Sequence, residues 1–180
     1  MNNVYLVGFM GTGKTSAGKE AARLTGRSFM DLDVLIEKKE KRAISDIFAK
    51  EGERYFRALE KETLKRVSQG KRLIVACGGG IVIDKENIKI MNETGIIICL
   101  TAQPQVILKR TLVYTHRPLL NVKDPGKQIE LLLKSRAPYY AKAQATLDTS
   151  KLSVKQVARN IIKAASYKPP AKSQRRKEKM

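Results

Sequence analysis

Short apolar runs alternate with longer stretches of helical period along this chain. The apolar runs have the length of buried β-strands and fall at residues 4–7, 28–32, 73–77, 96–100 and 145–147. A spacing of three to four residues between apolar positions predicts helices at residues 15–24, 33–41, 45–52, 53–68, 85–94, 103–111 and 127–143, and from 153 onward. Strands that alternate with helices in this way predict a three-layer α/β fold, a parallel sheet covered by helices on both faces.

Turn and capping residues set the expected limits of these helices. Ser45, Asp84 and Ser153 fit N-caps, and Gly52 is expected to close the helix over 45–52. Pro138 is expected to bend the helix in which it lies. Two prolines, a histidine and mixed polar residues predict a loop over residues 112–126. Loops of this length are uncommon unless they bind a ligand or close over a site, so we expect a lid at about 112–124.

Composition adds a strong positive charge to this picture. The 180 residues suit one domain, and 36 Lys and Arg against 17 Asp and Glu give a formal charge of +19. A charge of this size is typical of proteins that bind nucleic acid, an anionic membrane surface or a small anionic substrate. Residues 168–180 contribute +5 and lack core residues, which predicts a basic disordered tail outside a single domain at 1–167.

The cysteines and the apolar runs indicate where the protein acts. Cys77 and Cys99 each end an apolar run, so we expect buried reduced thiols rather than metal ligands. No apolar run approaches the length of a membrane span, and the first residues lack the features of a signal peptide. We therefore expect a cytoplasmic protein without a membrane partner.

A phosphate-binding motif lies between the first strand and the first helix. Residues 8–15, GFMGTGKT, fit G-x-x-x-x-G-K-[ST] at every fixed position. Glycines let successive backbone N–H groups turn toward phosphate oxygens, and the helix N-terminus adds partial positive charge. Lys14 can reach the β- and γ-phosphates, while the Thr15 hydroxyl can ligate Mg²⁺. The motif predicts that the protein binds a nucleoside triphosphate.

Two carboxylates follow the second predicted strand. If the strand continues through Asp31 and Asp33, both side chains point the same way, because side chains alternate along a strand. One carboxylate could then assist Mg²⁺ and the other accept a hydrogen bond from a substrate hydroxyl. The alternative is that one Asp caps a helix beside a solvated one.

Arginines and glycines predict the binding site for a second substrate. Arg57 and Glu60 lie three residues apart on one predicted helical face, so Glu60 could orient the guanidinium, although a surface ion pair is the alternative. Arg57 and Arg136 could together bind a carboxylate, because guanidinium planes match that anion with two hydrogen bonds. Arg117, in the predicted lid, could stabilise charge on a transferred phosphoryl group. The glycines at 78–80 follow a buried strand and allow a ligand to approach the backbone.

These motifs, in their order and spacing, resemble the shikimate kinases. The resemblance rests on GFMGTGKT, DLD, GERYFRALE, CGGG, HRPLL and RAPYY and covers roughly residues 1–165. It implies a P-loop kinase fold like that of nucleoside-monophosphate kinases, with a five-stranded parallel sheet in the order 2-3-1-4-5. It also implies transfer of the ATP γ-phosphate to the 3-hydroxyl of shikimate, in the route to chorismate and the aromatic amino acids.

The resemblance assigns roles to individual residues. It implies that Lys14, Asp33 and Arg117 are catalytic, that Thr15 and Asp31 hold one Mg²⁺, and that substrate-binding helices span about 33–61. For ATP it implies contacts from Gly11, Thr12, Gly13, Lys14, Thr15, Ser16, Arg110 and Arg117, with Arg110 stacked on adenine. For shikimate it implies contacts from Asp33, Arg57, Gly78, Gly79, Gly80 and Arg136.

The chain departs from the family pattern in two segments. The family often has a proline on the other side of adenine, whereas residues 147–154 read LDTSKLSV, and the first half of the predicted lid, LVYT, is unusually apolar. Gluconate kinase is the runner-up enzyme. A nucleic-acid-binding P-loop protein is disfavoured because aromatic residues are not clustered among the basic ones. We expect a monomer with ATP and shikimate as partners and no obligate nucleic acid, and His116 as a lid residue rather than a general base.

Overall fold

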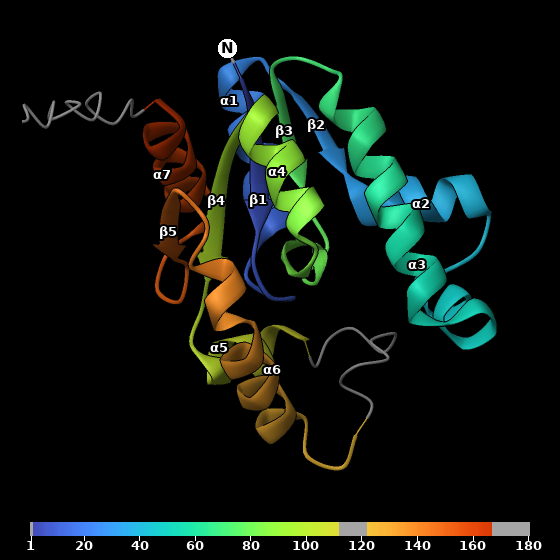
Figure 1. Cartoon of the computed structure of the whole chain (residues 1–180). Coiled ribbons are helices and arrows are strands. Elements are labelled where there is room, and N and C mark those ends of the chain that lie inside the picture. Colours follow the sequence, from blue (N-terminus) through green and yellow to red (C-terminus); the bar gives the residue numbers. More distant parts are fainter. Residues whose placement is uncertain (1, 112–121, 167–180) are drawn as a thin grey trace, which may run out of the picture.

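Five parallel strands form a single sheet in the computed structural model, which describes residues 2–111 and 122–166. The strands are β1 (Asn3–Val7), β2 (Ser28–Asp31), β3 (Leu73–Ala76), β4 (Gly95–Thr101) and β5 (Ala145–Asp148). They pair in the order β2-β3-β1-β4-β5, and every neighbouring pair is parallel (Figure 1). The predicted fold class and strand order are confirmed.

Helices cover both faces of the sheet. They are α1 (Lys14–Thr25), α2 (Leu32–Glu40), α3 (Ile44–Ser68), α4 (Lys85–Thr94), α5 (Pro104–Thr111), α6 (Pro125–Tyr140) and α7 (Val154–Ser166), with a 3₁₀ turn η1 at Ile81–Ile83. Val4 and Leu6 of β1 pack with buried residues of α1 and α7. Tyr5 and Val7, which alternate with them, pack with α3, α4 and the end of α6. The two cores make the three layers that the sequence predicts.

Helix limits agree with the prediction in part. Asp84 caps α4, and the Ser153 hydroxyl accepts the backbone N–H of Gln156 at the start of α7. Ser45 is not an N-cap, because α3 already begins at Ile44 after Ala43. The predicted break at Gly52 is real but internal: Gly52 has φ 79° and ψ 174°, which kinks one long element. Left-handed backbone of this kind favours glycine.

Helix α6 is shifted relative to the prediction, and most of the predicted lid lies outside the described residues. α6 runs from Pro125 to Tyr140 instead of 127–143, since Asp124 caps it and Pro125 suits the first turn. Of the predicted lid only residues 122–124 are described, and the predicted tail lies outside the described residues. None of the helices that the structure describes has the length and apolarity to cross a membrane.

Asn3 ties the start of the central strand to the turn before β3. Its side-chain amide donates to the Gly70 carbonyl oxygen at 2.9 Å, and its Oδ1 accepts the Leu73 N–H at 3.0 Å. The residue is 1% exposed, so water cannot replace these partners. The bonds fix where β3 begins beside β1, and hence where the loop after β3 ends.

We therefore predict that Asn3→Ala lowers the free energy of unfolding by about 1–3 kcal/mol, because it leaves a buried N–H and a carbonyl without partners. Urea denaturation followed by circular dichroism measures the change. Asn2→Ala is the matched control, since Asn2 is exposed and contacts Arg27 through its backbone oxygen, which the substitution keeps. Equal stability of the two variants would contradict this role for Asn3.

Candidate active site

One cavity of about 820 Å³ lies at the carboxyl ends of the strands. Its walls come from the loop after β1, the end of β2, α3, the loop after β3, α5, α6 and the loop before α7. All the site residues predicted from the sequence line it, except Arg117, which lies outside the described residues together with His116. Open α/β sheets bind their ligands at this edge.

The loop over residues 8–13 has the conformation that a phosphate cradle requires. Gly8, Gly11 and Gly13 have φ values of 132°, 76° and 91°, in a region that side chains disfavour. A Cβ on Gly8 would also collide with the Leu100 carbonyl oxygen of β4. Lys14 donates from Nζ to the carbonyl oxygens of Gly8 and Phe9 at 2.8 and 2.9 Å, so its ammonium group lies over the loop.

The two carboxylates after β2 do not lie on one strand, and this expectation is wrong. β2 ends at Asp31, whose Oδ1 accepts the N–H of Asp33 at 3.1 Å and caps α2. An N-cap carboxylate accepts hydrogen bonds from the free N–H groups of the first helical turn. The helix therefore begins directly after Asp31, and Asp33 lies in its first turn. The capping alternative holds for Asp31. Asp33 is half-buried, with Oδ1 close to Gly78, and is not a solvated surface residue.

Asp31 also contacts the phosphate loop. The Thr15 hydroxyl donates to Asp31 Oδ2 at 2.8 Å, which places a hydroxyl and a carboxylate oxygen together beside Lys14. Oxygen ligands of this kind fit Mg²⁺, which is usually held by one or two protein groups plus phosphate and water. No cluster of three or more His, Cys, Asp or Glu that could hold a metal ion occurs in residues 2–111 and 122–166.

The Arg57–Glu60 pair is an internal ion pair and not a surface one. Arg57 Nη1 lies 2.7 Å from Glu60 Oε2, and the Glu60 side chain is fully buried. Glu53 contacts the same guanidinium at 3.0 Å from the solvent side. Burial raises the pKa of Glu60 to about 7, and the charge of Arg57 opposes that rise. Glu60 therefore orients Arg57 as predicted, at the cost of a desolvated carboxylate.

The glycines at 78–80 leave room for functional side chains. A Cβ on Gly78 would meet Asp33 Oδ1 at 3.1 Å and would press against Glu60 Oε1, which accepts no hydrogen bond from a described residue. A Cβ on Gly80 would collide with the Arg57 guanidinium. The sequence predicted close approach of a ligand here, and the structure adds that the protein's own charged groups need the space.

Arg136 faces the same loop from α6. It is 8% exposed, its guanidinium lies 5.6 Å from the Phe9 ring centre, and Nη1 would lie 3.3 Å from a Cβ on Gly79. Tyr140, one turn further on, donates its hydroxyl to the Gly79 carbonyl oxygen at 2.7 Å, and burial raises its pKa to about 12. Sequence reasoning missed Tyr140. Its spacing of four from Arg136 was the signal, since such residues share a helix face.

Arg110 lies at the other end of the cavity. Its guanidinium donates to the Gly11 carbonyl oxygen at 3.2 Å and to Thr149 Oγ1 and O at 3.0 and 2.9 Å. Thr149 and Leu152 line the cavity here, within the segment that lacks the family's proline. Thr149 was not predicted, and nothing in the local pattern singled it out.

Comparison with known proteins decides the family. A family model described as shikimate kinase matches residues 10–166. The chain belongs to the shikimate kinase family. A shikimate kinase of Thermodesulfovibrio yellowstonii is 46% identical over 163 residues, covering 91% of this chain and 94% of that one. A shikimate kinase of Caldanaerobacter subterraneus is 43% identical and covers 91% of this chain and 96% of its own length.

Solved structures of shikimate kinases have the same fold. That of Acinetobacter baumannii, in complex with shikimate, has a TM-score of 0.87 at 38% identity and covers 91% of this chain and 92% of that one. That of Aquifex aeolicus has a TM-score of 0.79 at 31% identity, covering 90% and 95%. A gluconokinase from Sinorhizobium meliloti shares the fold at 13% identity. As a shikimate kinase family member, the chain is an ATP-using phosphotransferase.

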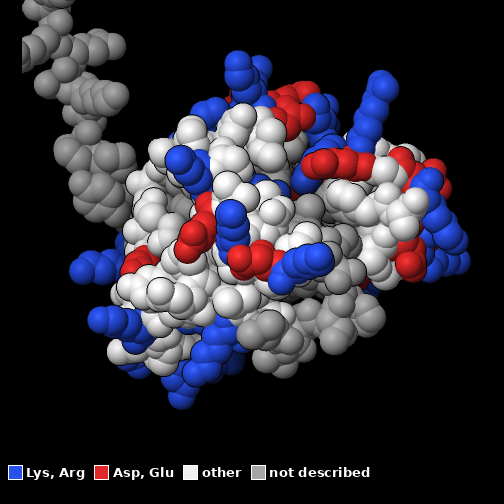
Figure 2. Space-filling view, turned by 90° about the horizontal axis from the view of Figure 1, so that it is seen from below, with Lys and Arg blue, Asp and Glu red and all other residues white. Residues whose placement is uncertain are grey.

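Figure 2 shows the molecule from the end of the sheet where the cavity lies. Basic and acidic side chains are interspersed over much of this face. Toward the lower left edge of this view, basic side chains lie without acidic neighbours. The kinase hypothesis for the positive charge is favoured over nucleic-acid binding because the chain belongs to the shikimate kinase family.

We predict that Glu60 makes stability depend on pH. Its folded pKa of about 7 exceeds its ordinary value of 4.5, so its contribution to stability is present below 4.5 and is lost as the pH rises through 7. The free energy of unfolding of the wild type, relative to Glu60→Gln, should fall over this window by up to about 3 kcal/mol.

Urea denaturation of both proteins without ligands, at several pH values between 4.5 and 8, measures this difference. Glu62→Gln, on an exposed part of α3, is the control, because contact with Lys39 lowers the pKa of Glu62 and so gives no loss over the window. If the difference in unfolding free energy between the wild type and Glu60→Gln does not change with pH, the raised pKa of Glu60 is contradicted.

Proposed function

We propose that this chain transfers the γ-phosphoryl group of ATP to the 3-hydroxyl of shikimate, giving shikimate 3-phosphate and ADP. The observation that carries the proposal is one continuous cavity. A phosphate loop forms one part of its wall, and two arginines, half-buried Arg57 and buried Arg136, face the glycines at 78–80 in another. The family and the shikimate-bound relative support the choice of acceptor.

On the nucleotide side, the backbone N–H groups of residues 11–16 bind the phosphates. Lys14 then exchanges the carbonyl oxygens of Gly8 and Phe9 for phosphate oxygens, so its charge moves little on binding. Arg110 lies flat against adenine, as its position beside the loop before α7 allows. Thr15 and Asp31 would hold one Mg²⁺, and the ion would neutralise phosphate charge.

On the acceptor side, Arg57 and Arg136 bind the shikimate carboxylate with two planar guanidinium groups. The backbone at 78–80 lines the ring. Asp33 accepts a hydrogen bond from the attacking hydroxyl and takes its proton as that oxygen bonds to the γ-phosphorus; the bond from this phosphorus to the bridging oxygen breaks, and the oxygen leaves with ADP. Arg117, in the proposed lid, stabilises the negative charge on the transferred phosphoryl group, and closure excludes water.

The remaining proposals concern the molecule as a whole. We propose that residues 1–167 act as one domain, that the protein is a monomer, and that it acts in the cytoplasm. Free, buried Cys77 and Cys99 fit a reducing compartment. Size-exclusion chromatography with light scattering tests the monomer, and a stable dimer at micromolar concentration would contradict it.

A coupled assay of ADP release tests the reaction. Purified protein with ATP and Mg²⁺ should release ADP only when shikimate is added, and mass spectrometry should detect shikimate 3-phosphate. Gluconate and a nucleoside monophosphate are the control acceptors. Equal turnover with either control, or none with shikimate, would overturn the proposed function.

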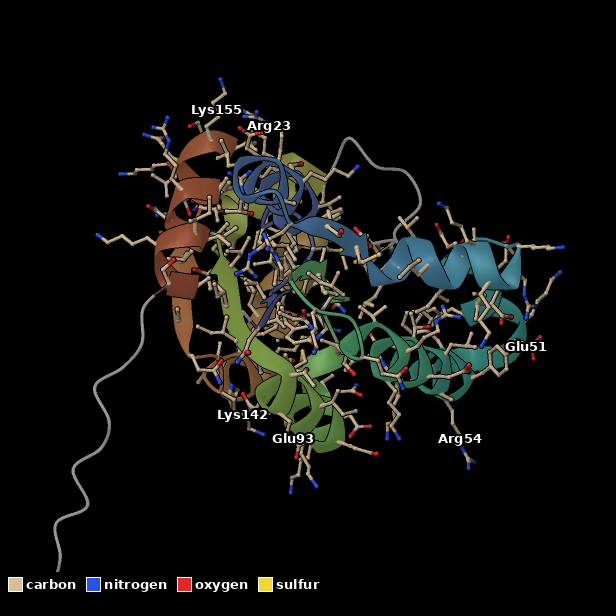
Figure 3. The ribbon with its side chains drawn as sticks, turned by 90° about the horizontal axis from the view of Figure 1, so that it is seen from above. Arg23, Glu51, Arg54, Glu93, Lys142 and Lys155 are labelled. Carbon is tan, nitrogen blue, oxygen red and sulfur yellow. The ribbon has the colours of Figure 1, made fainter. Side chains whose placement is uncertain are left out.

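Arg57→Ala is predicted to weaken shikimate binding by about a hundredfold or more, because the carboxylate loses one of its two guanidinium partners inside a buried site. The KM for ATP should change less than about twofold. Arg54→Ala is the matched control: Arg54 lies on the same helix but points away from the body of the molecule (Figure 3). A rise in KM for shikimate that is the same in both variants would contradict the role of Arg57.

Asp33→Asn is predicted to lower kcat by about a hundredfold or more while KM for shikimate changes little, because an amide keeps the size but cannot take the proton. Steady-state kinetics with both substrates saturating measures the change. Asp46→Asn, at an exposed position near the start of α3, controls for loss of a nearby negative charge. An unchanged kcat would remove the proposed role of Asp33.

A further inference from the structure

A single buried threonine joins three parts of the nucleotide end of the cavity. Thr149 follows β5 and is 2% exposed. Its hydroxyl lies 3.0 Å from the carbonyl oxygens of Thr12, in the phosphate loop, and Thr101, at the end of β4. The same hydroxyl accepts Nη1 of Arg110 at 3.0 Å. One side chain thus contacts the phosphate loop, the central sheet and the arginine proposed to bind adenine.

Arg110 is held by neutral oxygens alone among the described residues that it contacts. Gly11 O, Thr149 Oγ1 and Thr149 O accept its three hydrogen bonds, and it forms no ion pair with a described carboxylate. Its charge does act on one carboxylate at longer range, since Arg110 contributes, after Ser150, to lowering the pKa of Asp148. These bonds also fix the plane of the guanidinium, which matters because an arginine binds an aromatic ring through its flat face.

The Thr149 backbone ties the facing loop to the same point. Its carbonyl oxygen accepts both Arg110 Nη2, at 2.9 Å, and the Leu152 N–H, at 3.4 Å. Arg110 and Leu152 both line the cavity. In this chain Leu152 stands in the segment where no proline is present, so the loop depends on hydrogen bonds for its shape.

The hydrogen-bonding capacity of a hydroxyl suits this position. It has one proton to donate, here to the Thr12 or Thr101 carbonyl oxygen, and lone pairs to accept the guanidinium N–H. A bond from a cation polarises the hydroxyl and strengthens the bond that it donates, so the contacts support one another. A valine of the same shape could make neither bond.

We propose that Thr149 is a positioning residue for the nucleotide: it holds Arg110 against the adenine site and keeps that site in register with the phosphate loop. The proposal rests on the proposed function, because it assigns adenine to this end of the cavity. Without the hydroxyl, Arg110 would lose one of its fixed bonds and regain rotamer freedom, which ATP binding would have to remove again.

The first test compares Thr149→Val with Thr149→Ser, which keeps the hydroxyl. Thr149→Val should raise the KM for ATP by about tenfold and weaken inhibition by ADP to the same extent. The KM for shikimate and inhibition by tripolyphosphate, which has no base, should change by less than about twofold. Thr149→Ser should stay close to the wild type. A purely structural defect would instead affect shikimate and tripolyphosphate as well, and that result would overturn the proposal.

Thr146→Val is the matched control, since Thr146 lies exposed on β5 three residues earlier. It should leave all four constants unchanged. If it raises the KM for ATP as much as Thr149→Val does, the effect belongs to the strand and the proposal is overturned.

A double-mutant cycle asks whether Thr149 acts through Arg110. In an Arg110→Ala background, Thr149→Val should raise the KM for ATP by less than about twofold further, because its target is gone. Effects that multiply fully would overturn the proposal. If Thr149→Val does not fold, Arg110→Lys takes its place. An ammonium group cannot contact both Gly11 and Thr149 as the planar guanidinium does, so the KM for ATP should again rise by about tenfold. An unchanged KM for ATP would overturn the proposal.

The two levels of proposal can fail separately. Absence of shikimate-dependent turnover in the wild-type protein would overturn the proposed function. Normal wild-type turnover, together with an unchanged KM for ATP in Thr149→Val, would overturn only the role of Thr149.

Discussion

The acceptor side of the site depends on a carboxylate that has no access to water. Glu60 is fully buried, so its charge has to be met inside the protein, and Arg57 meets it at 2.7 Å. The pair fills the space next to the loop after β3, and that loop can pass only because Gly78 and Gly80 lack side chains. The space that this pair occupies therefore accounts for two of the three glycines, Gly78 and Gly80.

The nucleotide side follows a different rule. Lys14 and Arg110 donate to backbone carbonyl oxygens of the phosphate loop, and Arg110 also to Thr149. For Arg110, neutral oxygens fix the direction of the guanidinium without a short ion pair to a described carboxylate. On the proposed acceptor side, the Arg57 guanidinium is instead held by the buried carboxyl group of Glu60.

Most of the positive charge lies elsewhere. Arg23 and Lys155 project outward from α1 and α7 in Figure 3, and Glu20 beside them has its pKa lowered by Arg23 first and by Lys155 and Arg159 further away. Exposed pairs such as Arg23–Glu20 add little to stability, because water and salt screen them. The charge that first suggests nucleic acid is thus divided among a few cavity residues, residues 168–180 with +5, and a solvated surface.

The sequence by itself determined the elements and the chemistry. The approximate strand limits, the phosphate loop and the predicted residues that line the cavity followed from local pattern and from motifs, because strand burial and left-handed glycines leave direct traces in neighbouring residues. Tertiary structure decided the rest. Asp31 ended its strand by capping α2, Glu60 became a buried ion-pair partner instead of a surface one, and Tyr140 and Thr149 reached the loops at 79 and 12. The Asp31 cap and the Arg57–Glu60 pair are local contacts, but the burial of Glu60 depends on packing. Tyr140 and Thr149 contact residues 61 and 137 positions away, and a spacing can place a residue on a helix face but cannot name such a distant partner.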